Sequence, residues 1–239
     1  MSGERLDITT QDGVADANLA RPDGDPHAAV LLIMDAYGLR PQIEAMADRI
    51  AEQGYVVLAP NVFYRDVRGE LLTTEEISGG NAFAKVLPLV RGLTPDVIER
   101  DGPAYFDALG DGPVAITGYC MGGRAGWALA AAYPDRVAAL GGFHVGGLVT
   151  GAPDSPHTRA GKIAAEVYFG HADNDRNMNP EQIATLDGAL DDAGVRHRTE
   201  VYEGAAHGYT MADTPAYDEA AAERHYRELF ALLDRTVAA

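Results

Sequence analysis

Hydrophobic positions fall into two kinds of segment that alternate along the chain. Short runs of consecutive apolar residues, typical of buried strands, cover 28–34, 55–59, 114–118, 137–143, 164–169 and 198–202. Between most of these runs, apolar residues recur every three or four positions, which predicts helices over 41–52, 94–109, 121–133, 180–193 and 217–237. Strands that alternate with helices indicate an α/β fold, with a mostly parallel sheet covered by helices on both faces.

Two further parts of the sequence, the N-terminal segment and segment 61–93, complete the predicted fold. Segments 5–9 and 15–19 flank the turn Gln11-Asp12-Gly13, which predicts a hairpin at the sheet edge and brings the strands to about eight. Segment 61–93 is rich in glycine and charge, with weak periodicity and one expected short helix over 74–86. We interpret it as an excursion over one end of the sheet, where loops determine specificity. No linker divides the chain, so a single domain over 1–239 is expected.

Composition narrows the class of protein. The 239 residues are 46% hydrophobic and 23% charged, as in ordinary globular proteins. No apolar run approaches the ~20 residues of a membrane-spanning helix, and the N-terminus carries no apolar signal segment. The formal net charge of −17 opposes binding to nucleic acids and anionic membranes, which leaves a small molecule as the expected partner. The oligomeric state is left open.

Cys120 is the one cysteine, so an intramolecular disulfide and a zinc site of paired CxxC type are excluded. A free thiol fits a reducing, cytoplasmic location. Although His171 stands near two aspartates, no metal-ligand spacing surrounds it, so neither a metal nor another cofactor is expected.

Cys120 lies within Gly118-Tyr119-Cys120-Met121-Gly122-Gly123, between a predicted strand and a predicted helix. This is the placement of a nucleophile elbow, in which a strained turn requires small neighbours. The start of a helix also favours a thiolate. The alternative is a buried core cysteine beside a tight turn.

A nucleophile needs a base, and the base needs an orienting acid. Asp173 and His207 each follow a predicted strand, so both are expected at the same sheet end as Cys120. We favour Asp173 as the acid over the competing Asp175 and Asp154. For the oxyanion, the backbone N–H groups of Met121 and Ala36 are the candidate donors.

These residues resemble the dienelactone hydrolase (carboxymethylenebutenolidase) family of the α/β-hydrolase superfamily, over nearly the whole chain. The likeness rests on five segments: 118–123, Asp35-Ala36-Tyr37-Gly38, 54–60, Gly170-His171-Ala172-Asp173 and Ala206-His207-Gly208. It implies an α/β-hydrolase fold, a Cys120–His207–Asp173 triad, and backbone donors at Ala36 and Met121.

Two departures from the family concern the substrate. Founding members carry glutamate at the position of Asp35, and an arginine for the substrate carboxylate at the position of Met211. Asp35 and Tyr37 are therefore candidate substrate contacts, and Arg68 and Arg91 in the excursion are candidate replacement cations.

The sequence thus predicts hydrolysis of a small ester or lactone, such as a dienelactone-like enol ester, through a thioester on Cys120. Three alternatives remain: a promiscuous hydrolase of other small esters, a small-molecule binding protein without activity, and a thiol sensor. The absence of a second cysteine argues against the sensor.

Overall fold

The computed structural model describes residues 3–79 and 81–238, and within this part of the chain eight strands form one sheet. Its order is β1-β2-β4-β3-β5-β6-β7-β8, and all neighbours pair in parallel except β1 with β2 and β2 with β4. The strands are β1 Glu4–Thr10, β2 Gly13–Ala20, β3 Ala28–Ile33, β4 Tyr55–Pro60, β5 Val114–Tyr119, β6 Val137–Phe143, β7 Glu166–Ala172 and β8 His197–Tyr202. The predicted parallel sheet with an edge hairpin is confirmed.

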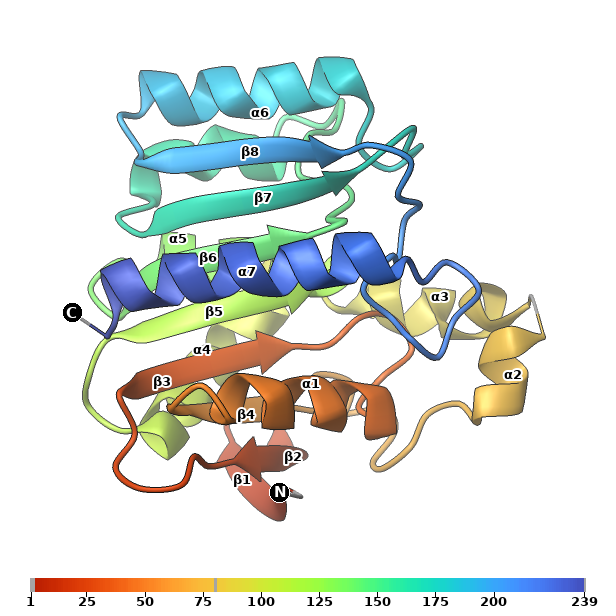
Figure 1. Cartoon of the computed structure of the whole chain (residues 1–239), viewed down its shortest axis with the longest axis vertical. Helices are drawn as coiled ribbons and strands as arrows, with labels where there is room; N and C mark the ends of the chain where they lie inside the picture. The colour runs from red at the N-terminus through yellow and green to blue at the C-terminus, as the bar shows by residue number, and fades with distance from the viewer. Residues whose placement is uncertain (1–2, 80, 239) are drawn as a thin grey trace.

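Helices cover both faces of this sheet, as Figure 1 shows with α1 and α7 on the near face and α4 and α5 behind. The helices are α1 Pro41–Ala51, α2 Thr74–Ser78, α3 Ala82–Gly92, α4 Pro95–Leu109, α5 Met121–Ala132, α6 Pro180–Asp192, α7 Glu219–Thr236 and a 3-10 helix, η1, Pro156–Lys162. The sequence pattern did not predict η1, which lies where a glycine-rich loop was expected after β6.

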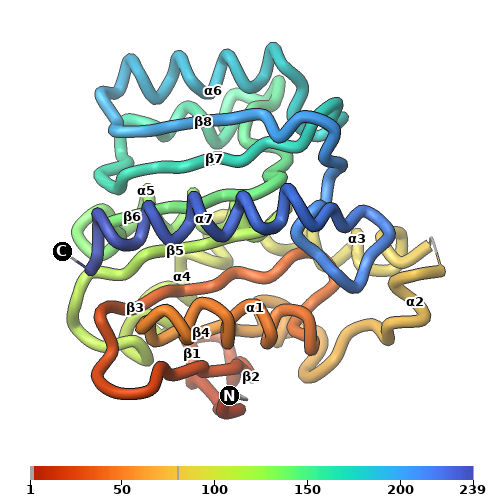
Figure 2. Tube along the Cα trace, viewed as in Figure 1, coloured from red at the N-terminus to blue at the C-terminus, as the bar shows by residue number. Residues whose placement is uncertain are grey.

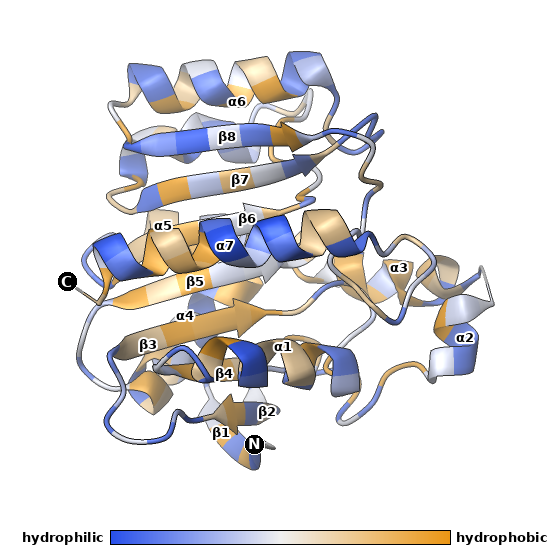
Figure 3. Cartoon of the chain, in the orientation of Figure 1, coloured by the Kyte–Doolittle hydropathy of each residue, from blue (hydrophilic) through white to orange (hydrophobic). Residues whose placement is uncertain are grey.

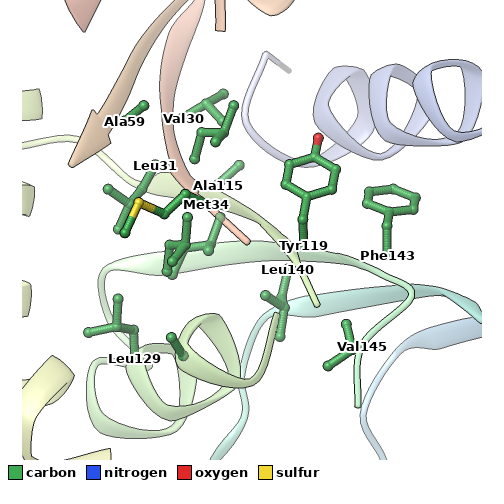
Figure 4. Close-up of a cluster of buried hydrophobic side chains, with 14 of the residues drawn as sticks. Val30, Leu31, Met34, Ala59, Ala115, Tyr119, Leu129, Leu140, Phe143 and Val145 are labelled. Carbon is green, nitrogen blue, oxygen red and sulfur yellow. The ribbon is translucent and has the colours of Figure 1, made fainter. Parts of the chain in front are cut away.

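The core lies between the sheet and its helices. Every residue of β4 and β5 is buried, which explains why the sequence of each strand is almost entirely apolar. Figure 3 shows β3 and β5 as mostly hydrophobic, whereas α1 and α7 alternate between hydrophobic and hydrophilic residues. Side chains of β3, β5, β6 and α5 meet in one cluster that includes Leu31, Leu129 and Leu140 (Figure 4).

The excursion at 61–93 contains two helices rather than the single one predicted, with Gly80 outside the described residues. A capping box at Thr73 and Glu76 starts α2, and Gly79 ends it after five residues. Both helices project beyond the carboxyl ends of the parallel strands, beside the segment that follows β8 (Figures 1 and 2). The excursion therefore stands at the sheet end where the candidate residues gather.

Candidate active site

Cys120 occupies the turn between β5 and α5 with φ 55° and ψ −119°. This left-handed backbone is strained for a residue other than glycine. A Cβ atom at Gly118 would overlap the carbonyl oxygen of Gly122, and one at Gly122 would overlap that of Ile33. The glycines of the elbow are therefore required by close backbone packing, and the half-buried sulfur is presented at the N-terminus of α5.

His207 approaches the sulfur from the loop after β8. Its Nε2 atom lies 3.1 Å from Sγ of Cys120, within hydrogen-bond reach. Two glycines with positive φ, Gly204 and Gly208, bend the loop on either side of the histidine. The structure therefore brings together two candidate residues that stand 87 positions apart in the sequence.

The acid beside His207 is Asp175, which corrects the expectation of Asp173. Oδ2 of Asp175 lies 2.6 Å from Nδ1 of His207, and its Oδ1 accepts hydrogen bonds from the backbone and side-chain amides of Asn177. Oδ2 of Asp173 instead accepts a hydrogen bond from the backbone N–H of Gly204. Asp154, the other competitor, is exposed in the loop before η1.

The length of β7 explains this difference. The strand continues to Ala172, three residues past its predicted end, so Asp173 comes directly after the strand. Asn174 then adopts a left-handed conformation with φ 52°, and the turned chain directs Asp175 toward His207. A left-handed residue is not visible in a hydrophobic pattern, although asparagine is one of the residues that favours it.

Electrostatics link these three side chains. Burial opposes the charge on His207, but the hydrogen bonds with Asp175 and Cys120 outweigh it and raise the pKa of His207 to about 10. Burial would likewise raise the pKa of Asp175, yet His207 and the Asn177 amides hold it below its usual value. At neutral pH the favoured arrangement is an imidazolium between a carboxylate and the sulfur, an environment that activates cysteine.

The two candidate oxyanion donors belong to the same cavity. Ala36 and Met121 both line it, beside Cys120. Met121 is the first residue of α5, where a backbone N–H has no intrahelical acceptor. Both residues therefore line the cavity beside Cys120, and their role as oxyanion donors stays a prediction.

Asp35 lines this cavity, but its carboxylate is paired with a buried arginine. Nη1 and Nη2 of Arg40 lie 2.6 and 3.2 Å from its two carboxylate oxygens. Arg40 is only 1% exposed and also pairs with Asp213, which follows the His207 loop, at 2.6 Å. This cluster of Asp35, Arg40 and Asp213 joins the loop after β3 to the loop after β8. The spacing of these residues in the sequence does not predict it.

The cavity has a volume of about 570 Å³ and a mostly apolar wall. Tyr37 and Met211 contribute to it, as do Ile77, Phe83 and Val90 from the excursion. The excursion thus contributes to the cavity wall, and its role in specificity stays a prediction.

Neither predicted replacement cation is in the cavity wall. Arg68 pairs with Asp7 on the surface and lines a separate depression, and Arg91 is exposed at the end of α3. The arginine that does line the cavity is Arg124, in the first turn of α5. The helical pattern of the sequence did not distinguish it.

His144 is a second histidine in the cavity wall that the sequence did not single out. It is 1% exposed, with a left-handed φ of 41°, and its Nε2 lies 2.8 Å from Oγ1 of Thr210. Its ring meets that of His207 edge to face at 5.2 Å, and burial holds its pKa well below the usual value. A neutral His144 therefore supports the loop that carries His207.

Within 3–79 and 81–238, no three His, Cys, Asp or Glu side chains are grouped as metal ligands would be. In the same part of the chain, no helix combines the length and apolar character needed to cross a membrane.

Comparisons with known proteins agree with this architecture. Residues 15–237 match the model of the dienelactone hydrolase family. A Salmonella typhi protein named "Putative carboxymethylenebutenolidase" is 27% identical over 235 residues, covering 93% of this chain and 83% of its own.

Among solved structures, "Putative Dienelactone Hydrolase" from Klebsiella pneumoniae superposes with a TM-score of 0.79 at 22% identity, over 98% of each chain. A dienelactone hydrolase-like promiscuous phosphotriesterase from metagenomic libraries has a TM-score of 0.77 at 20% identity, over 98% of this chain and 99% of its own. At these identities the structural likeness shows the α/β-hydrolase fold.

Proposed function

Because this chain belongs to the dienelactone hydrolase family, we propose that it hydrolyses a small ester or lactone through a thioester on Cys120. The observation that carries the proposal is the continuous contact from Asp175 to His207 to Cys120, at 2.6 and 3.1 Å. A base aligned with both a nucleophile and an orienting carboxylate is the arrangement that acyl transfer requires, and binding alone does not need it.

In the first half of the reaction, the Cys120 thiolate attacks the carbonyl carbon and forms the C–S bond. The carbonyl oxygen takes up the negative charge, and the backbone N–H groups of Ala36 and Met121, two residues of the cavity wall, stabilise it. When the C–O bond breaks, the leaving oxygen takes a proton from Nε2 of His207. Asp175 holds the imidazole by its Nδ1 atom throughout.

In the second half, neutral His207 takes a proton from a water molecule that attacks the thioester. The C–S bond breaks, the acid product leaves, and the sulfur returns to a thiolate beside the imidazolium. Enols and activated alcohols suit this chemistry because they leave as weak bases. The 570 Å³ cavity is within the size range of small-ligand sites, about 300–1,000 Å³.

The test is hydrolysis of a dienelactone and of 4-nitrophenyl acetate by the wild type and by Cys120→Ala. We expect Cys120→Ala to lose turnover of at least one of these esters while keeping its thermal unfolding transition. A Cys120-dependent burst of nitrophenol and a trapped acyl-enzyme adduct on Cys120, detected by mass spectrometry, would support the thioester. Equal turnover of both esters by the two proteins would overturn the proposal.

A further inference from the structure

Tyr119 immediately precedes the nucleophile, and the proposed reaction gives it no role. Figure 4 shows the rings of Tyr119 and Phe143 on the side of the sheet away from Leu129, a residue of α5. On that side Tyr119 contacts His225 of α7, the C-terminal helix. The elbow is therefore joined to the helices on both faces of the sheet.

A buried hydrogen bond links Tyr119 to His225. The hydroxyl oxygen of Tyr119 lies 3.0 Å from Nε2 of His225, and both residues are 0% exposed. Nδ1 of His225 lies 2.9 Å from the carbonyl oxygen of Ala222. A carbonyl oxygen only accepts hydrogen bonds, so Nδ1 carries the proton and Nε2 accepts the O–H of the tyrosine. Burial lowers the pKa of His225 to about 3, so this acceptor persists at any pH suited to ester hydrolysis.

Phe143, the last residue of β6, connects this hydrogen bond to the nucleophile. Its ring stacks on Tyr119 at 5.8 Å and meets His225 edge to face at 4.4 Å. Its carbonyl oxygen accepts a hydrogen bond from the backbone N–H of Cys120 at 3.1 Å. One residue therefore contacts Tyr119, His225 and the backbone of Cys120.

The polar pair adds direction to a core that apolar rings would fill equally well. A buried hydrogen bond contributes little net stability, because both groups lose their hydrogen bonds to water. It does restrict the two side chains to one geometry. The backbone of Cys120, with φ 55°, persists only if its surroundings hold it. The packing of Gly118 and Gly122 does so on the α5 side.

We infer that the hydrogen bond between Tyr119 and His225 holds the elbow from the α7 side, and that both are positioning residues for Cys120. The inference rests on the proposed function, because the 3.1 Å contact from Sγ to Nε2 of His207 matters only if these groups react together. Without the hydrogen bond the strained turn relaxes, and the sulfur loses alignment with its base.

Tyr55 provides a matched control within the same helix pairing. It is also 0% exposed, and its hydroxyl donates a hydrogen bond of 2.7 Å to Asp234 of α7. Tyr55 is the first residue of β4, whereas Tyr119 is the last residue of β5, so the two hydroxyls lie at opposite ends of the parallel strands. Loss of either hydroxyl weakens the attachment of α7, but only Tyr119 adjoins the nucleophile.

The test measures hydrolysis of 4-nitrophenyl acetate well below the unfolding temperature of each variant. Tyr119→Phe and His225→Phe should each lower kcat about fivefold and leave KM within about twofold. The double variant should be no slower than either single variant, because both remove the same hydrogen bond. His225→Gln, whose side-chain oxygen can accept from the tyrosine, should restore part of kcat. Tyr55→Phe should retain the kcat of the wild type.

Alkylation of Cys120 by iodoacetamide tests the same inference without hydrolysis. In Tyr119→Phe it should slow about fivefold at pH 6 and less at pH 9, where a thiolate forms without help from His207. Wild-type kcat and alkylation in Tyr119→Phe, or an equal loss of kcat in Tyr55→Phe, would overturn the positioning role alone. Equal hydrolysis by the wild type and Cys120→Ala would overturn the proposed function, and the alkylation rates would still decide whether Tyr119 positions the thiol.

Discussion

Nδ1 of His207 lies 2.6 Å from Oδ2 of Asp175, while Asp173, two residues earlier, accepts a hydrogen bond from the backbone of Gly204. Both carboxylates are at the carboxyl end of β7, yet only Asp175 can set the imidazole tautomer. The first prediction compares these neighbours. Asp175→Asn should lower kcat for a Cys120-dependent ester by about 10²–10⁴-fold, because an amide holds the imidazole less well and does not balance its charge.

Asp173→Asn is the matched control, since its amide oxygen still accepts the hydrogen bond from Gly204. We expect it to stay within a few-fold of the wild type. Steady-state kinetics at pH 7 and thermal unfolding of both variants measure the contrast. An equal loss of kcat in the two variants would refute the assignment of Asp175.

The second prediction concerns the buried arginine that joins two loops of the site. Arg40→Met should lower the free energy of unfolding by about 3–5 kcal/mol, because it leaves Asp35 buried without its partner. Lys85→Met, which breaks the exposed pair with Glu76, should cost about 0–1 kcal/mol. Urea denaturation provides both values, and equal values would show that the Arg40 cluster contributes little to stability.

The third prediction tests why glycine stands at position 122. Gly122→Ala should destabilise the protein by at least about 1–3 kcal/mol and reduce activity, because the methyl group would overlap backbone oxygens of residues 33 and 34. Gly112→Ala, with no heavy atom within 4 Å of the added group, should have little effect on either property. The measurements are thermal unfolding and ester hydrolysis of both variants. Equal effects of the two substitutions would contradict this explanation of Gly122.

The fourth prediction is a dependence of stability on pH that arises from a buried histidine other than His207. Burial lowers the pKa of His171 to about 4, compared with 6.5 for an exposed imidazole. Between pH 6.5 and 4 the unfolded chain therefore binds a proton that the folded chain does not, and the free energy of unfolding falls as the pH is lowered.

His171→Leu should remove up to about 1.4 kcal/mol per pH unit of this dependence within that window. The measurement is urea denaturation of both proteins at several pH values from 4 to 7. Part of the acid sensitivity should persist in the variant, because His225 is also buried and its pKa is lowered to about 3. Parallel curves for the two proteins would contradict the assignment to His171.

Much of the fold was predictable because buried parallel strands require apolar side chains on both faces. The run at 137–143 coincides with β6, and the other runs overlap their strands. The meeting of Cys120 and His207 was predictable for a related reason: each follows such a run and has a glycine within two residues, which tight turns need.

Other features depend on information that a local pattern does not contain. The choice of Asp175 depends on where β7 ends and on one left-handed residue after it. Arg40 pairs with Asp213, 173 positions away. Arg124 lies in a helix so rich in alanine and glycine that its apolar positions do not define one buried face, and only the assembled cavity singles it out.

The ion pairs of Arg40 with Asp35 and Asp213 bear on how the ligand specificity of this fold can change. The loops that carry Ala36 and His207 are joined through the ion pairs of Arg40 with Asp35 and Asp213, so a change in one loop is resisted by the other. Another part of the cavity wall comes from the segment between β4 and α4, which contributes Ile77, Phe83 and Val90. We expect substitutions in this segment to change which ligand is accepted while Cys120 and His207 stay in contact, which makes it the segment to diversify in directed evolution.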